Sequence, residues 1–343
     1  MAWKAGAAGG MVAGVREGAM KVTILGGGGF LGRKLAARLA ADGALGGKPV
    51  EELTLFDLSP PAAPEGAGFP VRCVGGDVSD ASAMSEAVPE KTSVVFHLAA
   101  VVSAAAEADF DLGMRVNLDG TRALVERCRA LPAAPRVVFT SSVASFSGGQ
   151  EAVLADDARQ VPANSYGAQK AMGEMLLADA TRKGFLDAVC IRLPTVIVRP
   201  GRPNKAASSF VSAILREPLL GLETTYPVGE EFGVWVCSPR VAVEWFVHAA
   251  TMETAALGLD RGVNPPGRRV TVAEMLAALP GNARGLVRPQ PDPAIEAIVS
   301  GWPAAFTAER ARRLGFSETP GLDVILRGFV EDDLEATRAE RAA

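Results

Sequence analysis

The chain has 343 residues, of which 48% are hydrophobic and 22% are charged, proportions that are ordinary for a globular protein. Its 35 basic and 39 acidic residues give a net charge of −4 without a basic tract, which argues against nucleic-acid binding by bulk charge. Four scattered cysteines and two histidines argue against a disulfide framework and a metal site, and they are typical of a reducing cytoplasm.

Residues 1–20 are rich in glycine and alanine and end at Met20, directly before the apolar run KVTIL. The glycines interrupt every apolar stretch, so we expect no secretory signal. The sequence also has no run of about 18 apolar residues, the length that a membrane span needs. We therefore expect residues 1–20 to be a disordered extension, or an overlong start, of a cytoplasmic protein without membrane contact.

Short apolar runs rich in β-branched residues alternate with longer helical patterns in the first half of the chain. Nearly continuous apolar character predicts strands that are covered on both faces of a parallel sheet. Such alternation predicts an α/β fold, a Rossmann-type doubly wound parallel sheet over residues 21–193. The expected strands are 21–25, 53–57, 70–74, 93–98, 136–141 and 188–193, and the expected helices are 29–42, 80–87, 108–130 and 164–183.

After residue 193 proline and glycine become frequent and the helical patterns become shorter. We expect residues 194–343 to form a smaller, mostly helical C-terminal lobe that binds the substrate. No clean linker is visible, which predicts that segments of this lobe interleave with the sheet domain.

The run TILGGGGFLGR contains the pattern Gly26-x-x-Gly29-x-x-Gly32 between an expected strand and an expected helix. A helix N-terminus offers free N–H groups and partial positive charge, and glycine lets a pyrophosphate come close to the backbone. Gly32 would let the helix pack closely on the strand. Read alone, the run would also fit a flexible hinge.

Asp57 ends the next expected strand. A carboxylate at this place accepts hydrogen bonds from an adenosine ribose and repels a 2′-phosphate. No arginine follows it closely, so the sequence favours NAD over NADP. The alternative is an ordinary acid at the end of a strand.

Tyr166 and Lys170 are four residues apart in SYGAQK, which puts them on one face of the helix at 164–183. A nearby ammonium favours the phenolate and lowers the pKa of a tyrosine from about 10, so that it can act as a general base. Ser142 follows the strand at 136–141, at the sheet edge where ligands bind in such folds. Its hydroxyl is placed to hold a substrate oxygen, although it would also fit a simple cap of the strand.

These residues, with HLAA at 97–100 and RVNLDGT at 115–121, resemble the extended short-chain dehydrogenase/reductase (NAD-dependent epimerase/dehydratase) family. The resemblance runs over nearly the whole chain from Met20. Within the family, HLAAVVSAAAEADFDLG, RLPTVIVRPGRPNKAASSF and PDPAIEAIVSGWP are most similar to D-erythronate dehydrogenases. The resemblance implies an NAD-dependent oxidoreductase that oxidises the C2 hydroxyl of a small sugar acid, with Ser142, Tyr166 and Lys170 as catalytic residues.

The resemblance also implies which residues hold NAD. Asp77 and Val78 would meet the adenine, Ala99 and Ala100 the pyrophosphate, and residues 194–196 the nicotinamide. The full expected set is Gly26, Gly29, Phe30, Leu31, Gly32, Asp57, Asp77, Val78, Leu98, Ala99, Ala100, Asn117, Thr140, Tyr166, Lys170, Pro194, Thr195 and Val196.

A sugar acid needs a cation for its carboxylate. The candidates are Arg199, Arg202, Lys205 and Arg240, although each one alone is more simply a solvated side chain. The residues expected to bind the substrate are Ser103, Ser142, Tyr166, Arg202, Asn204, Ser208 and Arg240.

Two other functions remain open for this sequence. A nucleotide-sugar epimerase would use the same scaffold and would keep its cofactor without net reduction. A non-catalytic dinucleotide-binding protein is less favoured because Tyr166 and Lys170 are both present. We expect no metal and no nucleic acid, and a homodimer formed through the helical patterns at 108–130 and 164–183, which would equally suit core-facing helices.

Overall fold

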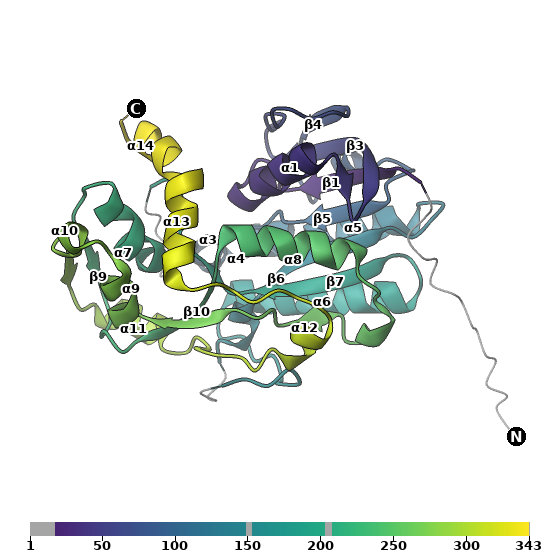
Figure 1. Ribbon diagram of the computed structural model, residues 1–343. Helices are drawn as coiled ribbons and strands as arrows, with labels where there is room; N and C mark the ends of the chain where they lie inside the picture. The colour runs from purple at the N-terminus through teal and green to yellow at the C-terminus, as the bar shows by residue number, and fades with distance from the viewer. Residues whose placement is uncertain (1–17, 149–152, 203–207, 343) are drawn as a thin grey trace, which may run out of the picture.

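The computed structural model describes residues 18–148, 153–202 and 208–342 of the chain. Within these ranges the expected α/β fold is confirmed: a mainly parallel sheet is covered by helices on both faces, and a smaller lobe lies beside it (Figure 1). Residues 1–17 of the expected N-terminal extension lie outside the described ranges, and Met20 already begins the first strand.

The sheet has eight strands in the order β4-β3-β1-β5-β6-β7-β11, with the short β2 antiparallel to the start of β3. All other pairs are parallel. The order reverses between β1 and β5, which opens a crevice at the carboxyl ends of these strands. The strands are β1 (Met20–Leu25), β2 (Ala44–Leu45), β3 (Lys48–Asp57), β4 (Val71–Gly75), β5 (Val94–His97), β6 (Arg136–Ser142), β7 (Asp187–Leu193) and β11 (Gly262–Val263).

Two helical layers cover the sheet. Helices α1 (Phe30–Asp42) and α8 (Pro239–Thr251) share one apolar core with it, which includes Leu35, Trp245 and Phe246. On the other face lie α2 (Ala81–Ala87), α5 (Gly120–Arg129) and α6 (Ser165–Arg182). Because aliphatic side chains fill both faces of the central strands, these strands lack the alternation of a half-exposed sheet.

The helix expected at 108–130 is interrupted. The chain forms α3 (Ser103–Ala108), α4 (Phe110–Gly113), a π-helical turn (Met114–Asp119) and then α5. Such turns insert a residue into an otherwise α-helical ladder and often occur at functional sites. Here the turn carries Asn117, whose side chain points into the protein and is 1% exposed.

The C-terminal lobe has a core of its own, in which helices pack on two small sheets. The lobe is mostly helical, as expected, and the sheets β12-β10-β8 and β13-β9 add strands that the sequence did not predict. Its strands are β8 (Thr195–Val196), β9 (Thr224–Tyr226), β10 (Gly233–Cys237), β12 (Arg268–Thr271) and β13 (Val287–Pro289), and its helices α7 (Ser209–Leu219), α9 (Val272–Ala278), α10 (Gly281–Arg284), α11 (Pro293–Val299), α13 (Leu322–Asp332) and α14 (Leu334–Ala342).

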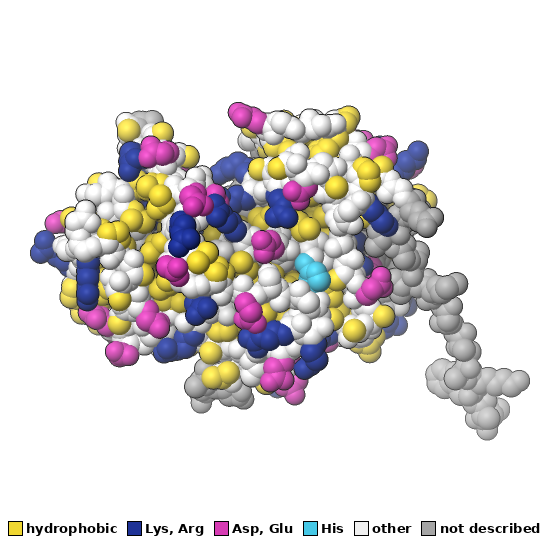
Figure 2. Space-filling view, in the orientation of Figure 1, with side chains coloured by type: hydrophobic (Ala, Val, Ile, Leu, Met, Phe, Trp, Pro, Cys, Tyr) yellow, Lys and Arg dark blue, Asp and Glu magenta, His cyan; other side chains and the backbone are white. Residues whose placement is uncertain are grey.

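Three segments from the second half of the chain return to the main sheet, and one of them, α12 (Glu309–Arg313), adds Ala311 to the core that α1 and α8 share with it. Strand β11 extends its edge beside β7, and α8 lies across one of its faces (Figure 1). None of the helices in the described ranges combines the length and apolar character that crossing a bilayer requires. Figure 2 shows basic and acidic side chains interspersed over the visible face, without a basic patch.

Candidate active site

The glycine-rich turn after β1 is pressed against two neighbouring strands. Gly26 has a φ of +88°, and a Cβ added to it would lie 2.6 Å from the backbone nitrogen of Ala99. The N–H groups of Gly26 and Gly27 both donate to the carbonyl of Phe56, at 2.8 and 2.9 Å. A Cβ on Gly32 would overlap the carbonyl oxygen of Gly26. The first and last glycines of the motif are therefore required by the close approach of backbone to backbone.

Gly28, to which the motif assigns no role, also has a structural reason to be glycine. Gly28 donates its N–H to Oδ2 of Asp57 at 2.9 Å, and a Cβ there would lie 3.0 Å from the same oxygen. Leu58 donates to Oδ1 at 2.8 Å. Each carboxylate oxygen can accept a further hydrogen bond, so Asp57 retains capacity for a ribose. Gly29 caps α1 without a side chain, which leaves the first turn of the helix open to an anion.

Asp77 and Val78 lie beyond β4. The N–H and hydroxyl of Ser79 donate to Oδ1 of Asp77 at 2.9 and 2.7 Å, and Arg115 lies 3.8 Å from Oδ2. These hydrogen bonds and then the Arg115 charge lower the pKa of Asp77, so its carboxylate is available as an acceptor at neutral pH. Val78 is buried where a Cβ on Gly120 would strike it, at 2.7 Å.

Asn117 joins the segment after β5 to helix α6. Its Oδ1 accepts the N–H of Val101 at 2.8 Å, and its Nδ2 donates to the carbonyl of Val101 at 3.1 Å and to Oε1 of Gln169 at 2.8 Å. Its polar atoms are thus used within the protein, which fits support of the active-site helix. The sequence reasoning missed Gln169, because the pattern that identified Tyr166 and Lys170 gave no weight to the residues between them.

The other residues expected at the cofactor lie at the same edge of the sheet. Phe30 and Leu31 begin α1, and residues 98–100 follow β5. Thr140 lies on β6 and donates to the carbonyl of His97 at 3.1 Å, while residues 194–196 lead from β7 through β8. The structure therefore brings segments from five parts of the chain to the carboxyl ends of β1, β3, β5, β6 and β7.

Lys170 lies inside the protein on the face of α6 that also carries Tyr166. Its Nζ is 4.7 Å from the ring centre of Phe139 and 5.6 Å from that of Tyr166, and the residue is 1% exposed. Burial lowers the pKa of Lys170 to about 7, and the charge of Glu174 acts in the opposite direction. Among the described residues, its Nζ has no hydrogen-bond or ion-pair partner, so its donors are free to meet a ligand.

The Tyr166 hydroxyl forms a hydrogen bond with Ser142. Burial raises the pKa of Tyr166 to about 12, while the hydrogen bond with Ser142 and the charge of Arg199 lower it in part. This direction differs from the expectation that Lys170 would hold the pKa below about 10. The reason is desolvation, which disfavours the phenolate and also weakens the charge on Lys170 itself.

Arg199 is the cation that faces Tyr166. It follows β8, where Ser212 accepts its N–H at 3.2 Å and Arg216 donates to its carbonyl at 2.7 Å, so its backbone is held from α7. Its half-buried guanidinium has no hydrogen-bond or ion-pair partner in the part of the chain that the structure describes. A carboxylate bound there would find a guanidinium fork without a competing internal acid.

Arg240 and Arg202 do not share this position. The guanidinium of Arg240 binds Glu331 at 2.8 Å and Asp332 at 2.5 Å on the surface, so it is occupied by two carboxylates of α13, contrary to the substrate contact expected from the sequence. Arg202 is exposed and lies 3.4 Å from the carbonyl of Glu340. The expected roles of Ser103, at the start of α3, and Ser208, at the start of α7, stay predictions, and Asn204 and Lys205 lie outside the described residues.

No three His, Cys, Asp or Glu side chains come together as metal ligands within the described ranges. Of the residues expected at the reactive centre, the structure thus brings Ser142, Tyr166 and Lys170 together and adds Arg199 beside them.

The chain matches known proteins over most of its length. Residues 22–231 match the model of the NAD dependent epimerase/dehydratase family. The D-erythronate dehydrogenase of Cupriavidus necator is 49% identical over 321 residues, which are 91% of this chain and 98% of that protein. The D-erythronate dehydrogenase of Haemophilus influenzae is 39% identical over 320 residues, 92% of this chain and 100% of that protein.

A solved structure resembles this chain at a sequence identity comparable to that of the two dehydrogenases. The crystal structure described as a nucleoside-diphosphate-sugar epimerase from Agrobacterium tumefaciens superposes with a TM-score of 0.88 at 43% sequence identity. The match covers 95% of this chain and 98% of that one.

Proposed function

This chain belongs to the NAD dependent epimerase/dehydratase family, and from that premise we propose that it oxidises the C2 hydroxyl of D-erythronate to 2-oxo-D-erythronate with NAD⁺. It is an oxidoreductase, and the observation that carries the specific reaction is the grouping of a partly buried tyrosine, a serine hydroxyl and an arginine that has no partner among the described residues. The names of its two dehydrogenase relatives support the choice of substrate.

The residues at the carboxyl edge fit NAD. Gly26 and Gly32 let the turn pack closely on the neighbouring backbone, and Gly29 leaves the start of α1 without a side chain, which suits a pyrophosphate. Asp57 retains lone pairs for the adenosine ribose. The negative charge of Asp57 also disfavours the 2′-phosphate of NADP. Lys170, whose Nζ has no hydrogen-bond partner among the described residues, would hold the nicotinamide ribose. When bound, NAD⁺ accepts the hydride that leaves C2 of the substrate.

Tyr166 takes the proton of the C2 hydroxyl in this reaction. Its phenolate is the active form, and a pKa of about 12 means that the protein must stabilise that form. Ser142 and Arg199 do so directly, since both lower the pKa of Tyr166. With substrate bound, the single hydroxyl proton of Ser142 is donated to the substrate oxygen in place of Tyr166, which aligns this oxygen with the base.

Arg199 binds the substrate carboxylate. A planar guanidinium matches a carboxylate with two parallel hydrogen bonds, and partial burial makes such a pair stronger than it is in water. Because C2 is bonded directly to the carboxylate carbon, a cation beside Tyr166 places the C2 hydroxyl at the phenol. The same cation serves two purposes, since it also favours the phenolate.

The experiment follows NADH formation by the purified protein with D-erythronate, longer aldonates and UDP-sugars. We expect turnover with D-erythronate and NAD⁺ and poor turnover with NADP⁺. Tyr166→Phe should abolish NADH formation and leave NAD binding intact. Tyr226→Phe, which changes the chain's other tyrosine, in the C-terminal lobe, should retain NADH formation. Activity on UDP-sugars alone would overturn the proposal.

A nucleotide-sugar epimerase is the second candidate, because the similar solved structure from Agrobacterium tumefaciens bears that description. An epimerase would keep NAD through purification and would interconvert UDP-sugars without net NADH. A non-catalytic dinucleotide-binding protein would bind NAD and turn over neither class of substrate.

A further inference from the structure

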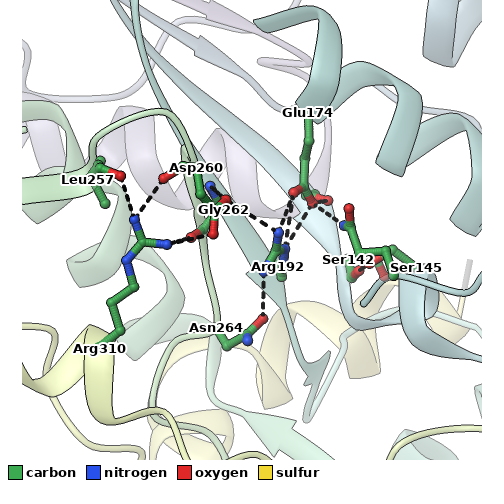
Figure 3. A network of polar contacts seen from close by, with 11 residues as sticks. Ser142, Ser145, Glu174, Arg192, Leu257, Asp260, Gly262, Asn264 and Arg310 are labelled. Atoms are coloured by element: carbon green, nitrogen blue, oxygen red, sulfur yellow. Dashed lines mark hydrogen bonds and ion pairs between the residues drawn. The ribbon is translucent and has the colours of Figure 1, made fainter. Parts of the chain in front are cut away.

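Glu174 lies on α6 one turn beyond Lys170 and two turns beyond Tyr166, on the same face of the helix. Its carboxylate binds the guanidinium of Arg192 on β7, with Nε and Nη2 at 3.0 and 2.8 Å from Oε2 (Figure 3). Both side chains are buried, at 6% and 7% exposure. Neither Glu174 nor Arg192 has a role in the proposed reaction as described so far.

A buried ion pair is a poor way to stabilise a protein, because the loss of hydration offsets most of the attraction. The contacts of Glu174 indicate another role. Its Oε1 accepts the hydroxyl of Ser141, the residue before Ser142 on β6, and the amide of Gln160 at 3.0 Å. One carboxylate therefore connects α6, β6 and β7 behind the reactive centre.

The network continues to the backbone of Ser142. Gln160 also donates to Oγ of Ser145 at 3.0 Å, and Ser145 in turn donates to the carbonyl of Ser142 at 2.8 Å. The side-chain oxygen of Ser142 accepts the N–H of Ala144 at 3.1 Å. The end of β6 is thus fixed through both the backbone and the side chain of Ser142.

The opposite end of the network holds Arg192. Nη1 of Arg192 lies 3.5 Å from Oδ1 of Asn264, and Nη2 lies 3.7 Å from Asp260. Asp260 is bound by Arg310 of α12 at 2.7 Å (Figure 3). The guanidinium of Arg192 lies 5.3 Å from the ring centre of Phe146. These contacts fix the guanidinium of Arg192 in addition to its ion pair with Glu174.

We propose that Glu174 is a positioning residue, which fixes the Ser142 end of β6 against the face of α6 that carries Tyr166 and Lys170. The inference rests on the proposed dehydrogenase reaction, because it assigns Glu174 to the geometry of that reaction's serine and tyrosine. Catalytic groups need such support, since a displacement of about 1 Å at the reacting atoms can cost roughly 100-fold in rate.

Glu174 also contributes charge at Lys170. Burial keeps His97 of β5 neutral, with its pKa near 3, and holds the pKa of Cys190 of β7 far above its usual value, so neither carries charge at neutral pH. Tyr166 is neutral below pH about 12. Among the described groups that act on Lys170, the carboxylate of Glu174 is thus the charged one. Its loss would leave Arg192 uncompensated, and the pKa of Lys170 would fall.

The test compares Glu174→Gln with Asp187→Asn in the full chain. Asp187 starts β7 and pairs with Arg136 at 2.9 Å and with Arg261. It therefore forms a similar, largely buried ion pair at the opposite end of β6 and β7. We expect both variants to lower thermal stability. Glu174→Gln should also lower kcat roughly 100-fold with little change in KM for NAD⁺, while Asp187→Asn should leave kcat unchanged. Equal kcat values in both variants would overturn the inference.

The titration of Lys170 gives a readout without turnover. Its side-chain NMR signal, assigned by its loss in Lys170→Arg, should titrate near pH 7 in the wild-type protein. The midpoint should shift to lower pH in Glu174→Gln and stay in place in Asp187→Asn. A variant that had merely lost structure would show a lower kcat but an unchanged titration midpoint for Lys170. That result would contradict the role assigned to Glu174.

Gln160→Met provides a second variant if Glu174→Gln does not fold. It removes the hydrogen bonds to Ser145 and Glu174 and keeps the ion pair with Arg192, so we expect a roughly tenfold lower kcat with only a small loss of stability. An unchanged kcat in Gln160→Met would overturn the inference. Failure of the wild-type protein to oxidise any aldonate would instead refute the proposed function, and the two failures are therefore distinguishable.

Discussion

Replacing Arg199 by methionine removes the cation beside Tyr166 and keeps most of the side-chain volume. The guanidinium has no partner among the described residues, so the variant breaks no internal ion pair, and the protein should keep its stability. Its effect should fall on the substrate. A hydrogen bond to a charged group contributes about 1.5–3 kcal/mol, and a bidentate pair, which has two such bonds, therefore about 3–6 kcal/mol.

This energy corresponds to a roughly 100- to 20,000-fold loss of kcat/KM for D-erythronate, at about 1.4 kcal/mol for each factor of ten. The pH profile should move as well. Arg199 lowers the pKa of Tyr166, so its removal raises that pKa further and shifts the ascending limb of activity to higher pH. The assay is NADH formation over a range of pH values, with Arg288→Met, an exposed arginine of the C-terminal lobe paired with Glu223, as the matched control.

A neutral substrate separates the two roles of Arg199. Erythritol has the same carbon chain and no carboxylate, so Arg199→Met should reduce its weak turnover far less than that of D-erythronate. An equal loss for both compounds would mean that Arg199 does not hold the carboxylate. Retention of D-erythronate kcat/KM within about threefold would refute the reasoning altogether.

Three further changes test other parts of the site. Gly32→Ala places a Cβ against the carbonyl of Gly26, so NAD affinity, measured by fluorescence titration, and melting temperature should both fall; an unchanged affinity would contradict the role given to the turn. Asp57→Ser removes the charge that repels a 2′-phosphate, and the ratio of kcat/KM for NAD⁺ to that for NADP⁺ should decrease; a constant ratio would show that Asp57 does not select the cofactor. Lys170 has a pKa of about 7 in the folded protein and about 10 when unfolded, so between these values the unfolded chain binds more protons and stability rises with pH. Lys170→Met should flatten that rise in urea unfolding, and an unchanged slope would contradict the lowered pKa.

The sequence predicted the sheet well because the information is local. Each central strand is a short apolar run, and each one lies within a few residues of its expected position. The glycine turn, Tyr166 and Lys170 were predicted for the same reason, since a fixed spacing on one element determines which side chains share a face. The break at Asn117 was missed because a π-helical turn keeps nearly the same pattern as the helix around it.

The contacts that the sequence did not predict join residues far apart in the chain. Gly28 is explained by Asp57, 29 positions later, and Arg240 by Asp332, 92 positions later. Arg240 suggested a substrate contact only while its partners in α13 were unknown. No local pattern distinguishes an arginine that meets an internal acid from one that is free, as Arg199 is among the described residues.

The return of α8 and β11 to the main sheet has a consequence for synthesis of the protein. When the ribosome has released residues 20–193, the strands up to β7 are present, but one face of the sheet lacks the helix that carries Trp245 and Phe246. The edge of β7 is also open until residues 262 and 263 emerge. An uncovered apolar face and an open edge both favour aggregation. The nucleotide-binding half therefore cannot mature as an independent unit, and the nascent chain depends on its own later segments, or on a chaperone, until about three quarters of it has been made.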